Sequence, residues 1–418
     1  MKDKQAKYPQ LRFKGFTDPW EERKLSDFSK TNYGGGTPKT AVTEYWDGNI
    51  PWIQSSNLTV DDVQEVNLDK FITDDAIKNS AAKLIPANSI AIVTRVGVGK
   101  LTLMKQEFAT SQDFLSLSEL HVDEQFGLYS IYKLLQKELN NIQGTSIKGM
   151  TKADLLTKNI MIPVEKDEQI KIGSFFKQLD DTIVLHQRKL AKLKELKQGY
   201  LQKLFPKNGA KVPELRFAGF ADAWEQRKLE KVFDTITDYV ANGSFESLRK
   251  NVNSSDINGF AYLVRLQDAS NNWQGPWLYT DQHGYEFLKK SRLQPDDIIM
   301  ANVGSVGKFF LVPKLDKPMT LAPNAVLIKS SENDQGFLYQ TMLTPEMQYK
   351  IFEKTTPGVQ SKINKTDFKM IETRLPNMDE QKKIGAFFKQ LDDTIALHQH
   401  KLNLLKEQKK GFLQNMFV

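Results

Sequence analysis

Apolar side chains recur at alternating steps of four and three residues in two segments of the chain, 172–204 and 384–416. Such spacing averages about 3.5 residues, the period of a coiled coil. The pattern therefore predicts two long helices, at 166–206 and 378–418, each with one apolar seam. In the first helix the seam consists of Ile172, Phe176, Leu179, Ile183, His186, Leu190, Leu193, Lys197, Tyr200 and Leu204. In the second helix it consists of Ile384, Phe388, Leu391, Ile395, His398, Leu402, Leu405, Lys409, Phe412 and Met416.

The two helical segments are near-copies of each other. Residues 167–205 and 379–417 are identical at 28 of 39 positions. A second motif is also repeated, because PQLRFKGFTDPWEERKL (9–25) resembles PELRFAGFADAWEQRKL (213–229). Its Phe and Trp residues are interpreted as anchors for the entry of the chain into each half. We infer that the repeated segments have the same role in each half of the chain.

Each helical seam has an obvious partner in the other copy. A repeated sequence favours an isologous contact with pseudo-twofold symmetry, and a twofold axis across the helices makes them antiparallel. Polar residues interrupt the seams at His186, Lys197, His398 and Lys409. The histidines could form a proton switch. Polar seam residues often specify the register of a coiled coil instead, and we favour that interpretation.

The regions between the repeats, 26–160 and 230–375, barely resemble each other and show a mixed α/β pattern. Short β-like runs occur at 50–54, 89–94, 261–266 and 297–301, and helical patterns occur near 126–140 and 336–353. We predict two mixed α/β (α+β) domains joined by two long helices that pair as an antiparallel coiled coil, with a pseudo-twofold internal repeat. The predicted divisions are a first domain at 1–165, a helix at 166–206, a second domain at 207–377 and a helix at 378–418.

Composition indicates the cellular compartment and the kind of partner that these domains have. The chain of 418 residues has no cysteine, which excludes disulfides and thiol catalysis and leads us to expect a reducing cytoplasm. No apolar run approaches the roughly 18 residues of a membrane span, and the N-terminal segment lacks the apolar core of a secretory signal. The net charge of +7 leans moderately toward a polyanionic partner such as DNA.

Catalytic motifs are missing from the sequence. Its five histidines form neither HExxH nor a metal-ligand pattern, and GxSxG does not occur. The stretches TRVGVGK (94–100) and NVGSVGK (302–308) resemble phosphate-binding loops, but Leu101 and Phe309 stand where such a loop needs Ser or Thr. We interpret both stretches as glycine turns between strands, able to present Lys100 or Lys308 to a DNA phosphate. We therefore predict a non-catalytic chain that binds no cofactor or metal.

Several polar loops carry side chains suited to reading DNA. They lie at 51–58, 144–155, 263–273 and 355–368, and Gln54 and Arg265 occupy comparable positions, as do Asn57 and Asp268. Gln, Asn, Ser, Thr and Arg read base edges, whereas Lys and Ser bind phosphates. For any single residue an ordinary surface loop is at least as probable an explanation. The candidate DNA-binding residues are Gln54, Ser55, Asn57, Arg95, Lys100, Ser146, Lys148, Thr151, Lys152, Arg265, Gln267, Asn302, Lys308, Gln360, Ser361, Lys362, Asn364 and Lys365.

A second apolar stripe lies off the seam of both helices, at Phe175, Leu185, Phe387 and Leu397. Its presence twice suggests two equivalent sites for two copies of a partner protein. Packing against the protein's own domains is the alternative. For the whole chain, the alternative to DNA recognition is a non-catalytic adaptor with two protein-binding domains on a coiled coil.

The complete pattern resembles the specificity subunit of type I restriction-modification systems. The motifs LRFxGFxxxWExRKL, GTSIKGMTKADLLTKNIMIP and DEQxKIGxFFKQLDDTIxLHQxKL carry this resemblance. It implies that each variable domain is a target recognition domain reading one half of a bipartite DNA sequence, while the helices set the gap. Two modification subunits using S-adenosylmethionine for adenine-N6 methylation, and restriction subunits using ATP and Mg, would dock on this chain.

Overall fold

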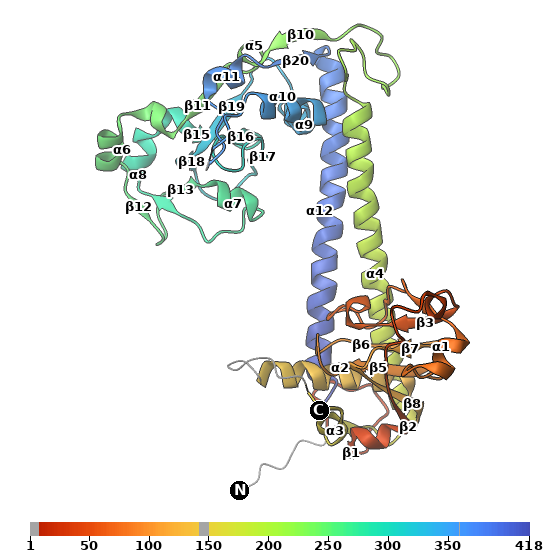
Figure 1. Ribbon diagram of the computed structural model, residues 1–418. Coiled ribbons are helices and arrows are strands. Elements are labelled where there is room, and N and C mark those ends of the chain that lie inside the picture. The colour runs from red at the N-terminus through yellow and green to blue at the C-terminus, as the bar shows by residue number, and fades with distance from the viewer. Residues whose placement is uncertain (1–7, 142–149, 359) are drawn as a thin grey trace. The chain divides into compact units, whose positions relative to one another are not determined.

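The computed structural model describes residues 8–141, 150–358 and 360–418. The chain forms two compact units (Figure 1). The first unit comprises Met1–Arg188 and Gln399–Val418, and the second comprises Lys189–His398. This division cuts each long helix in two, so each unit contains part of both helices. We describe each unit by itself.

The first unit is built on a four-stranded antiparallel sheet in the order β2-β8-β5-β6. The central strand β5 is buried along its whole length, as its sequence SIAIV requires. A smaller sheet, β4-β3-β7, has β3 and β7 parallel. The strands of this unit are β1 (Glu21–Lys24), β2 (Ser29–Gly34), β3 (Ile50–Ile53), β4 (Phe71–Ile72), β5 (Ser89–Val93), β6 (Leu101–Met104), β7 (Ala109–Thr110), β8 (Phe114–Leu120) and β9 (Asn159–Ile162). Its shorter helices are α1 (Asp74–Asn79), α2 (Glu124–Asn141) and α3 (Lys152–Leu156).

The second unit repeats this design. Its main sheet has the order β11-β19-β16-β17, and its smaller sheet, β12-β14-β13-β18-β15, again contains one parallel pair, β13 and β18. The strands are β10 (Glu225–Lys228), β11 (Thr235–Asp238), β12 (Ser254–Ser255), β13 (Ala261–Val264), β14 (Tyr279–Thr280), β15 (Arg292–Leu293), β16 (Ile298–Ala301), β17 (Phe309–Leu311), β18 (Met319–Leu321), β19 (Ala325–Lys329) and β20 (Glu372–Leu375). The shorter helices are α5 (Leu229–Val232), α6 (Phe245–Asn251), α7 (Leu266–Ser270), α8 (Gln282–Phe287), α9 (Gln335–Leu343), α10 (Pro345–Glu353) and α11 (Lys365–Lys369).

The predicted β-like runs correspond to β3, β5, β13 and β16, and the helical pattern near 126–140 corresponds to α2. The pattern at 336–353 differs, because it is divided into α9 and α10. Pro345 lacks the N–H that a continuing helix needs, so it begins a new helix instead. The hydroxyl of Thr344 accepts a hydrogen bond from the backbone N–H of Met347 and caps that helix.

Two long helices, α4 (Lys166–Lys203) and α12 (Met378–Asn415), carry the repeated sequence (Figure 1). In the first unit the start of α4 lies beside the end of α12, with the rings of Phe175 and Phe412 at 5.0 Å. In the second unit the end of α4 lies beside the start of α12, with Tyr200 and Phe387 at 4.9 Å. All predicted seam residues are buried or half-buried. The predicted antiparallel pairing is therefore confirmed within each unit.

The repeated motif at the front of each half anchors the chain to its long helix. Arg12 forms two hydrogen bonds with the buried Glu168 at 2.7 and 2.8 Å, and Arg216 forms two with Glu380 at 2.7 Å. The indole of Trp20 is buried against Phe126 and Phe417, and Trp224 packs against Phe205 and Phe337 in the same way. The interpretation of this motif as an anchor is confirmed.

The repeated start of each long helix, DEQxKIG, docks on a helix of the variable region. The amide oxygen of Gln169 accepts a hydrogen bond from the N–H of Asp123 at 2.9 Å, and Gln381 accepts one from Asp334 at 3.1 Å. A Cβ at Gly173 would lie 2.6 Å from the backbone nitrogen of Phe126, so a larger residue would separate α4 from α2. These contacts explain why Gln and Gly occur in both copies.

Candidate nucleic-acid interface

A glycine turn joins a central strand of the main sheet to its edge strand in each unit. The turn at 94–100 joins β5 to β6, and the turn at 302–308 joins β16 to β17. Both close with the same backbone bond of 2.9 Å, from Val93 N–H to the carbonyl of Lys100 and from Ala301 N–H to that of Lys308. Gly99 and Gly307 take positive φ values of 101° and 84°, which glycine adopts without strain. The prediction of glycine turns between strands is confirmed.

In the first unit this turn meets two other predicted loops. The ammonium of Lys100 donates to the carbonyl of Ser55 at 2.9 Å, which ties the turn to the 54–57 loop. A cavity next to the turn is lined by Arg95, Gly97, Thr151 and Lys152, among others. Burial lowers the pKa of Lys152, and the nearby charges of Lys83 and Arg95 lower it further, against an opposing effect of Asp113. The structure thus gathers Ser55, Arg95, Lys100, Thr151 and Lys152 at one place with several positive charges.

In the second unit the equivalent turn meets the equivalent loop. The N–H of Gly304 donates to the carbonyl of Ser361 at 2.8 Å, and that of Ile363 donates to the carbonyl of Asn302 at 3.1 Å. This loop precedes α11 just as Thr151 precedes α3. Asn364 and Thr151 both cap these short helices, at 2.8 and 3.0 Å from the capped N–H groups. Asn302, Lys308, Ser361, Lys362 and Asn364 are therefore brought together.

Gln54 and Arg265 occupy equivalent positions, as expected. Each follows a buried strand of the smaller sheet, β3 or β13, and begins one short helical turn. The backbone N–H of Gln54 donates to the side chain of Asn57 at 2.8 Å, and that of Arg265 donates to Asp268 at 2.9 Å. Asn57 and Asp268 are both buried.

Two of these residues are less available than predicted. The amide nitrogen of Asn57 donates to the carbonyl of Asn67 and to Asp69, both at 2.7 Å. Its oxygen accepts from the N–H of Gln54, so both donors and the acceptor are used inside the domain. The prediction that Asn57 reads bases is therefore corrected. The guanidinium of Arg265 contacts Asp268 at 2.7 Å and the carbonyl of Pro276 at 2.7 Å, which orients it and neutralises part of its charge.

The remaining candidates divide by exposure. Lys365 pairs with Asp238 at 2.7 Å and is half-buried. Gln54 is half-buried in its loop. Ser146 and Lys148 lie outside the described residues. The exposed candidates are Arg95, Thr151, Gln267, Lys308, Gln360, Lys362 and Asn364. Lys83, which sequence reasoning missed, contributes to the first cluster through its effect on Lys152.

The candidate partner-binding residues also divide. Phe175 packs against Phe13 and Phe412, and Phe387 packs against Tyr200 and Phe217, each within its own unit. At these two positions the structure corrects the prediction of an open apolar stripe. Leu185 and Leu397 are 64% and 65% exposed and remain available.

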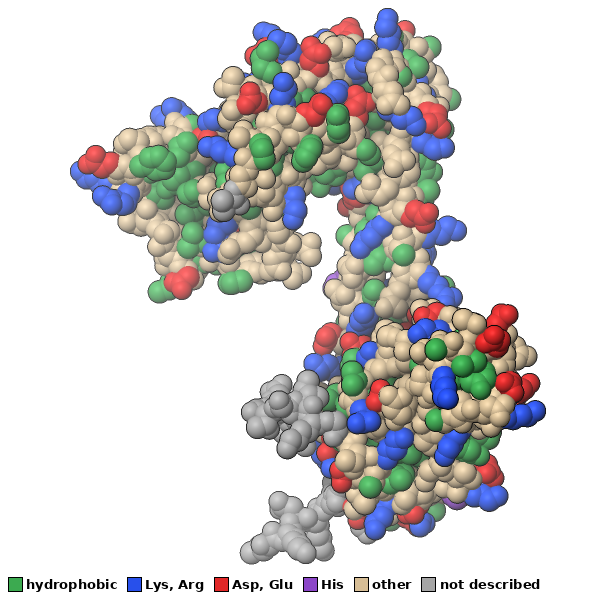
Figure 2. Space-filling view, viewed as in Figure 1, with side chains coloured by type: hydrophobic (Ala, Val, Ile, Leu, Met, Phe, Trp, Pro, Cys, Tyr) green, Lys and Arg blue, Asp and Glu red, His purple; other side chains and the backbone are tan. Residues whose placement is uncertain are grey.

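Basic and acidic side chains are interspersed on the face shown in Figure 2. Within the described ranges, no cluster of three or more metal-ligating side chains occurs. No helix among the residues that the structure describes is long and apolar enough to cross a membrane.

A family model described as the type I restriction modification DNA specificity domain matches the chain twice, at residues 17–195 and 222–407. The MjaIX specificity subunit of Methanocaldococcus jannaschii is 29% identical over 168 residues, which span 39% of this chain and 38% of that protein. The MjaVIII specificity subunit of the same organism is 22% identical over 416 residues, which span 95% of this chain and 91% of that protein. The solved structure of a type I restriction-modification S subunit from M. genitalium superposes with a TM-score of 0.61 at 14% identity, covering 98% of this chain and 99% of that one. The chain therefore belongs to the type I restriction-modification DNA specificity family and carries two copies of the family's domain.

Proposed function

We propose that this chain is the DNA specificity subunit of a type I restriction-modification complex, in which each variable domain reads one half of a bipartite target. One observation carries the proposal. Both units bring a glycine turn together with the loop before a short helix, yet the side chains at equivalent positions differ. Arg95 corresponds to Val303, and Thr151 corresponds to Asn364. Equivalent backbones with different side chains are what two different half-sites require.

The side chains at these clusters fit two roles in DNA binding. Exposed arginine and amide groups can make paired hydrogen bonds to base edges, which makes Arg95, Gln267 and Gln360 candidates for sequence readout. Lysine binds phosphates without regard to sequence, and this role suits the exposed Lys308 and Lys362. Arg265 and Lys365 are held by carboxylates, so they are better suited to shaping the loops than to donating freely.

The partners follow from membership of the family. We propose two modification subunits, which would supply S-adenosylmethionine-dependent adenine-N6 methylation, and restriction subunits, which would supply ATP- and Mg-dependent translocation and cleavage. This chain would supply recognition and no catalysis. Because Leu185 and Leu397 are exposed at equivalent positions of the two long helices, they are the best candidates for the contact with modification subunits.

DNA binding by the assembled complex tests the recognition role. We expect Lys362→Ala to weaken binding to all sequences about equally and to reduce the slope of log affinity against log salt by about one. We expect Arg95→Ala to relax the preference for one base pair, at a cost of about 1–3 kcal/mol for the correct site only. Titrations over a salt series, with sites randomised at one position each, measure both effects.

Arg23→Ala is a suitable control for both variants, because Arg23 is exposed on β1 and pairs with Glu21. This variant should keep the slope and the base preference. Binding by the parent complex that does not depend on salt would favour the adaptor function. Unchanged slope and base preference in both test variants would remove Lys362 and Arg95 from the DNA surface.

The partner contact has a separate test. Replacing both Leu185 and Leu397 with Glu places charges in an apolar interface, so the complex should lose bound modification subunits, while either single variant should lose one. The stoichiometry can be measured by the mass of the assembled complex. Leu196→Glu is the matched control, because Leu196 is an exposed leucine elsewhere on α4. Two bound subunits in the double variant would rule out this surface.

A further inference from the structure

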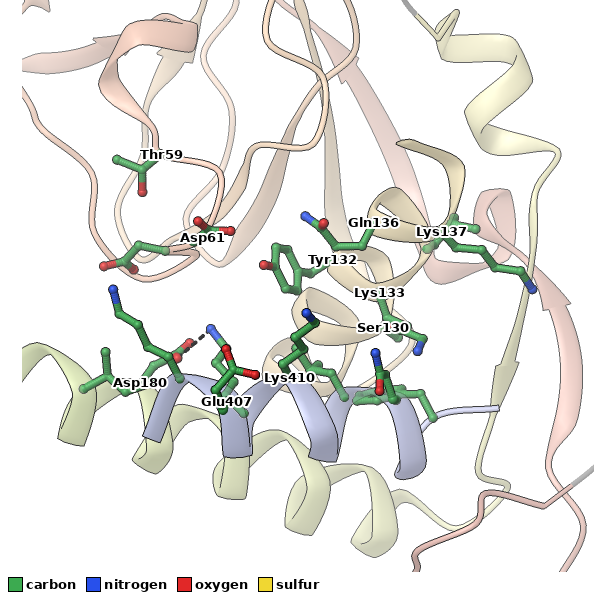
Figure 3. Close-up of a pocket in the computed structure, with 18 of the residues that line it drawn as sticks. Thr59, Asp61, Ser130, Tyr132, Lys133, Gln136, Lys137, Asp180, Glu407 and Lys410 are labelled. Carbon is green, nitrogen blue, oxygen red and sulfur yellow. Dashed lines mark ion pairs between the residues drawn. The ribbon is translucent and has the colours of Figure 1, made fainter. Parts of the chain in front are cut away.

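Asp180, on the long helix α4, is a buried carboxylate that the apolar seam does not explain. It is 4% exposed. Its two oxygens are contacted from two other elements, by the hydroxyl of Tyr129 on α2 at 2.7 Å and by the ammonium of Lys409 on α12 at 2.6 Å. Figure 3 shows this ion pair beside a groove of about 1040 Å³ that Asp61, Lys133 and Lys410 also line. Asp180 is thus where both long helices and the variable domain of the first unit meet.

The second unit contains the same arrangement. Asp392 on α12 accepts a hydrogen bond from the amide of Gln340 on α9 at 2.9 Å, and it pairs with Lys197 on α4 at 2.6 Å. Asp180 and Asp392 are the same position of the helical repeat, and so are Lys197 and Lys409. We call each carboxylate, its lysine and its third side chain a junction. The first junction is Asp180, Lys409 and Tyr129, and the second is Asp392, Lys197 and Gln340.

The two helices contribute opposite charges to the two junctions. In each of them, one repeat supplies the carboxylate and the other supplies the ammonium. If the repeats instead aligned in parallel, Asp180 would face Asp392 and Lys197 would face Lys409, so that like charges would meet. A slip of one heptad would move each carboxylate from its lysine by about 10 Å along the helix. Buried charges without partners are strongly unfavourable, so this pattern selects one orientation and one register.

We propose that Asp180 and Asp392 are positioning residues, which fix the orientation and register of the paired helices and tie them to the variable domain in each unit. Through this register they set the gap between the two half-sites. The claim that the register sets the gap rests on the proposed function, whereas the claim that the carboxylates fix the register does not. Because a polar residue at a single seam position can specify the register of a coiled coil, a charge pair at each junction is sufficient for this role.

The two junctions differ in their surroundings. Lys409 is 7% exposed, and its ammonium lies 5.5 and 5.7 Å from the ring centres of Tyr132 and Tyr129. Lys197 and Asp392 are more accessible to solvent. Water weakens the interaction of an accessible charge pair, so reversing a charge at the first junction should have the larger effect.

Crosslinking measures the register without DNA. The chain has no cysteine, so paired cysteines can be introduced without background. Phe175→Cys with Phe412→Cys reports on the first unit, and Tyr200→Cys with Phe387→Cys reports on the second, because each pair of rings is in contact. In otherwise unchanged chains, a short bis-maleimide should join both pairs. Asp180→Lys should lower the crosslinking of the first pair by about tenfold or more and leave the second unchanged.

Adding Lys409→Asp to Asp180→Lys should restore the first crosslink, because the opposite charges are again paired. Asp180→Asn provides a milder variant if the reversal prevents folding, and it should give a smaller loss in the same direction. Asp392→Lys and its rescue by Lys197→Asp repeat the experiment at the second junction. Full crosslinking with Asp180→Lys, or no recovery in a folded charge-swapped chain, would overturn the register role.

The gap is read from the methylated sites of complexes that carry the same substitutions without the cysteines. We expect Asp180→Lys to reduce methylation at the original gap by about tenfold or more, with recovery in the charge-swapped chain. An altered register with an unaltered gap would overturn the link between them. If the parent complex showed no sequence-specific DNA binding, the proposed function would fail, while the crosslinking result would still decide the role of the junctions.

Discussion

Exchange of residues 26–160 for the corresponding region of another specificity subunit should change one half of the DNA target and leave the other half and the gap unchanged. The physical reason is that this region holds the first cluster of candidate DNA-binding loops, whereas the contacts that anchor it are made by repeated residues. Glu168 and Gln169 of the repeated helix lie outside the exchanged region, and Arg12 lies before it. Mapping the methylated positions in cells that carry the chimeric subunit measures the result.

The donor region must preserve the contacts that cross the boundary. The backbone N–H of Asp123 donates to Gln169, and the hydroxyl of Tyr129 donates to Asp180. The transplanted region should therefore carry a tyrosine or an amide side chain at the position of Tyr129. The matched control exchanges residues 230–375, which should change the other half of the target. A chimera in which both halves change would show that the two variable domains do not read DNA independently.

Insertion of one helical turn into both long helices should lengthen the gap without changing either half-site. Four residues after Gln187 and four after Gln399 add about 6 Å to the helix pair. Because DNA rises by about 3.4 Å per base pair, the gap should grow by one or two pairs. Both insertion points lie at the boundary between the compact units, so the two junctions stay intact within their own units.

Two effects should weaken DNA binding by the four-residue insertion variant. Each added base pair turns the far half-site by roughly 35° about the DNA axis, which the helix pair does not follow. Four residues also leave a stutter in the seven-residue repeat, which locally unwinds the coil. We therefore expect weaker binding together with the longer gap, and growth by one pair more readily than by two. An insertion of seven residues at both points is the control for the stutter, because it preserves the repeat and adds about 10 Å.

Sequencing the methylated sites of these insertion variants decides the matter. A stable and active four-residue variant that kept the original gap would show that the helices connect the domains without measuring the distance between them. Insertion in one helix alone displaces the two seams relative to each other, so that variant should lose activity whichever function the helices have.

The sequence by itself determined the long helices, their antiparallel pairing, the central strands and the glycine turns. These features depend on patterns within short segments or on an exact internal repeat. The seam at Ile172, Phe176 and Leu179 repeats within two turns of one helix, and the strand SIAIV is buried because all its own residues are apolar or small. The family could be inferred for the same reason, since the repeated helix is a long and specific motif.

Only the tertiary structure decided which polar side chains are free to meet DNA and which are used inside the protein. The residue type of Asn57 predicts a base-reading role, but in the fold Asp69 and the carbonyl of Asn67 accept its hydrogen bonds. The sequence pattern does not single out Asp180, and only the fold buries it against Tyr129 and Lys409. The physical reason is that a polar group is satisfied by whichever partner the fold places within hydrogen-bonding distance, and a partner from a distant part of the chain leaves no local pattern in the sequence.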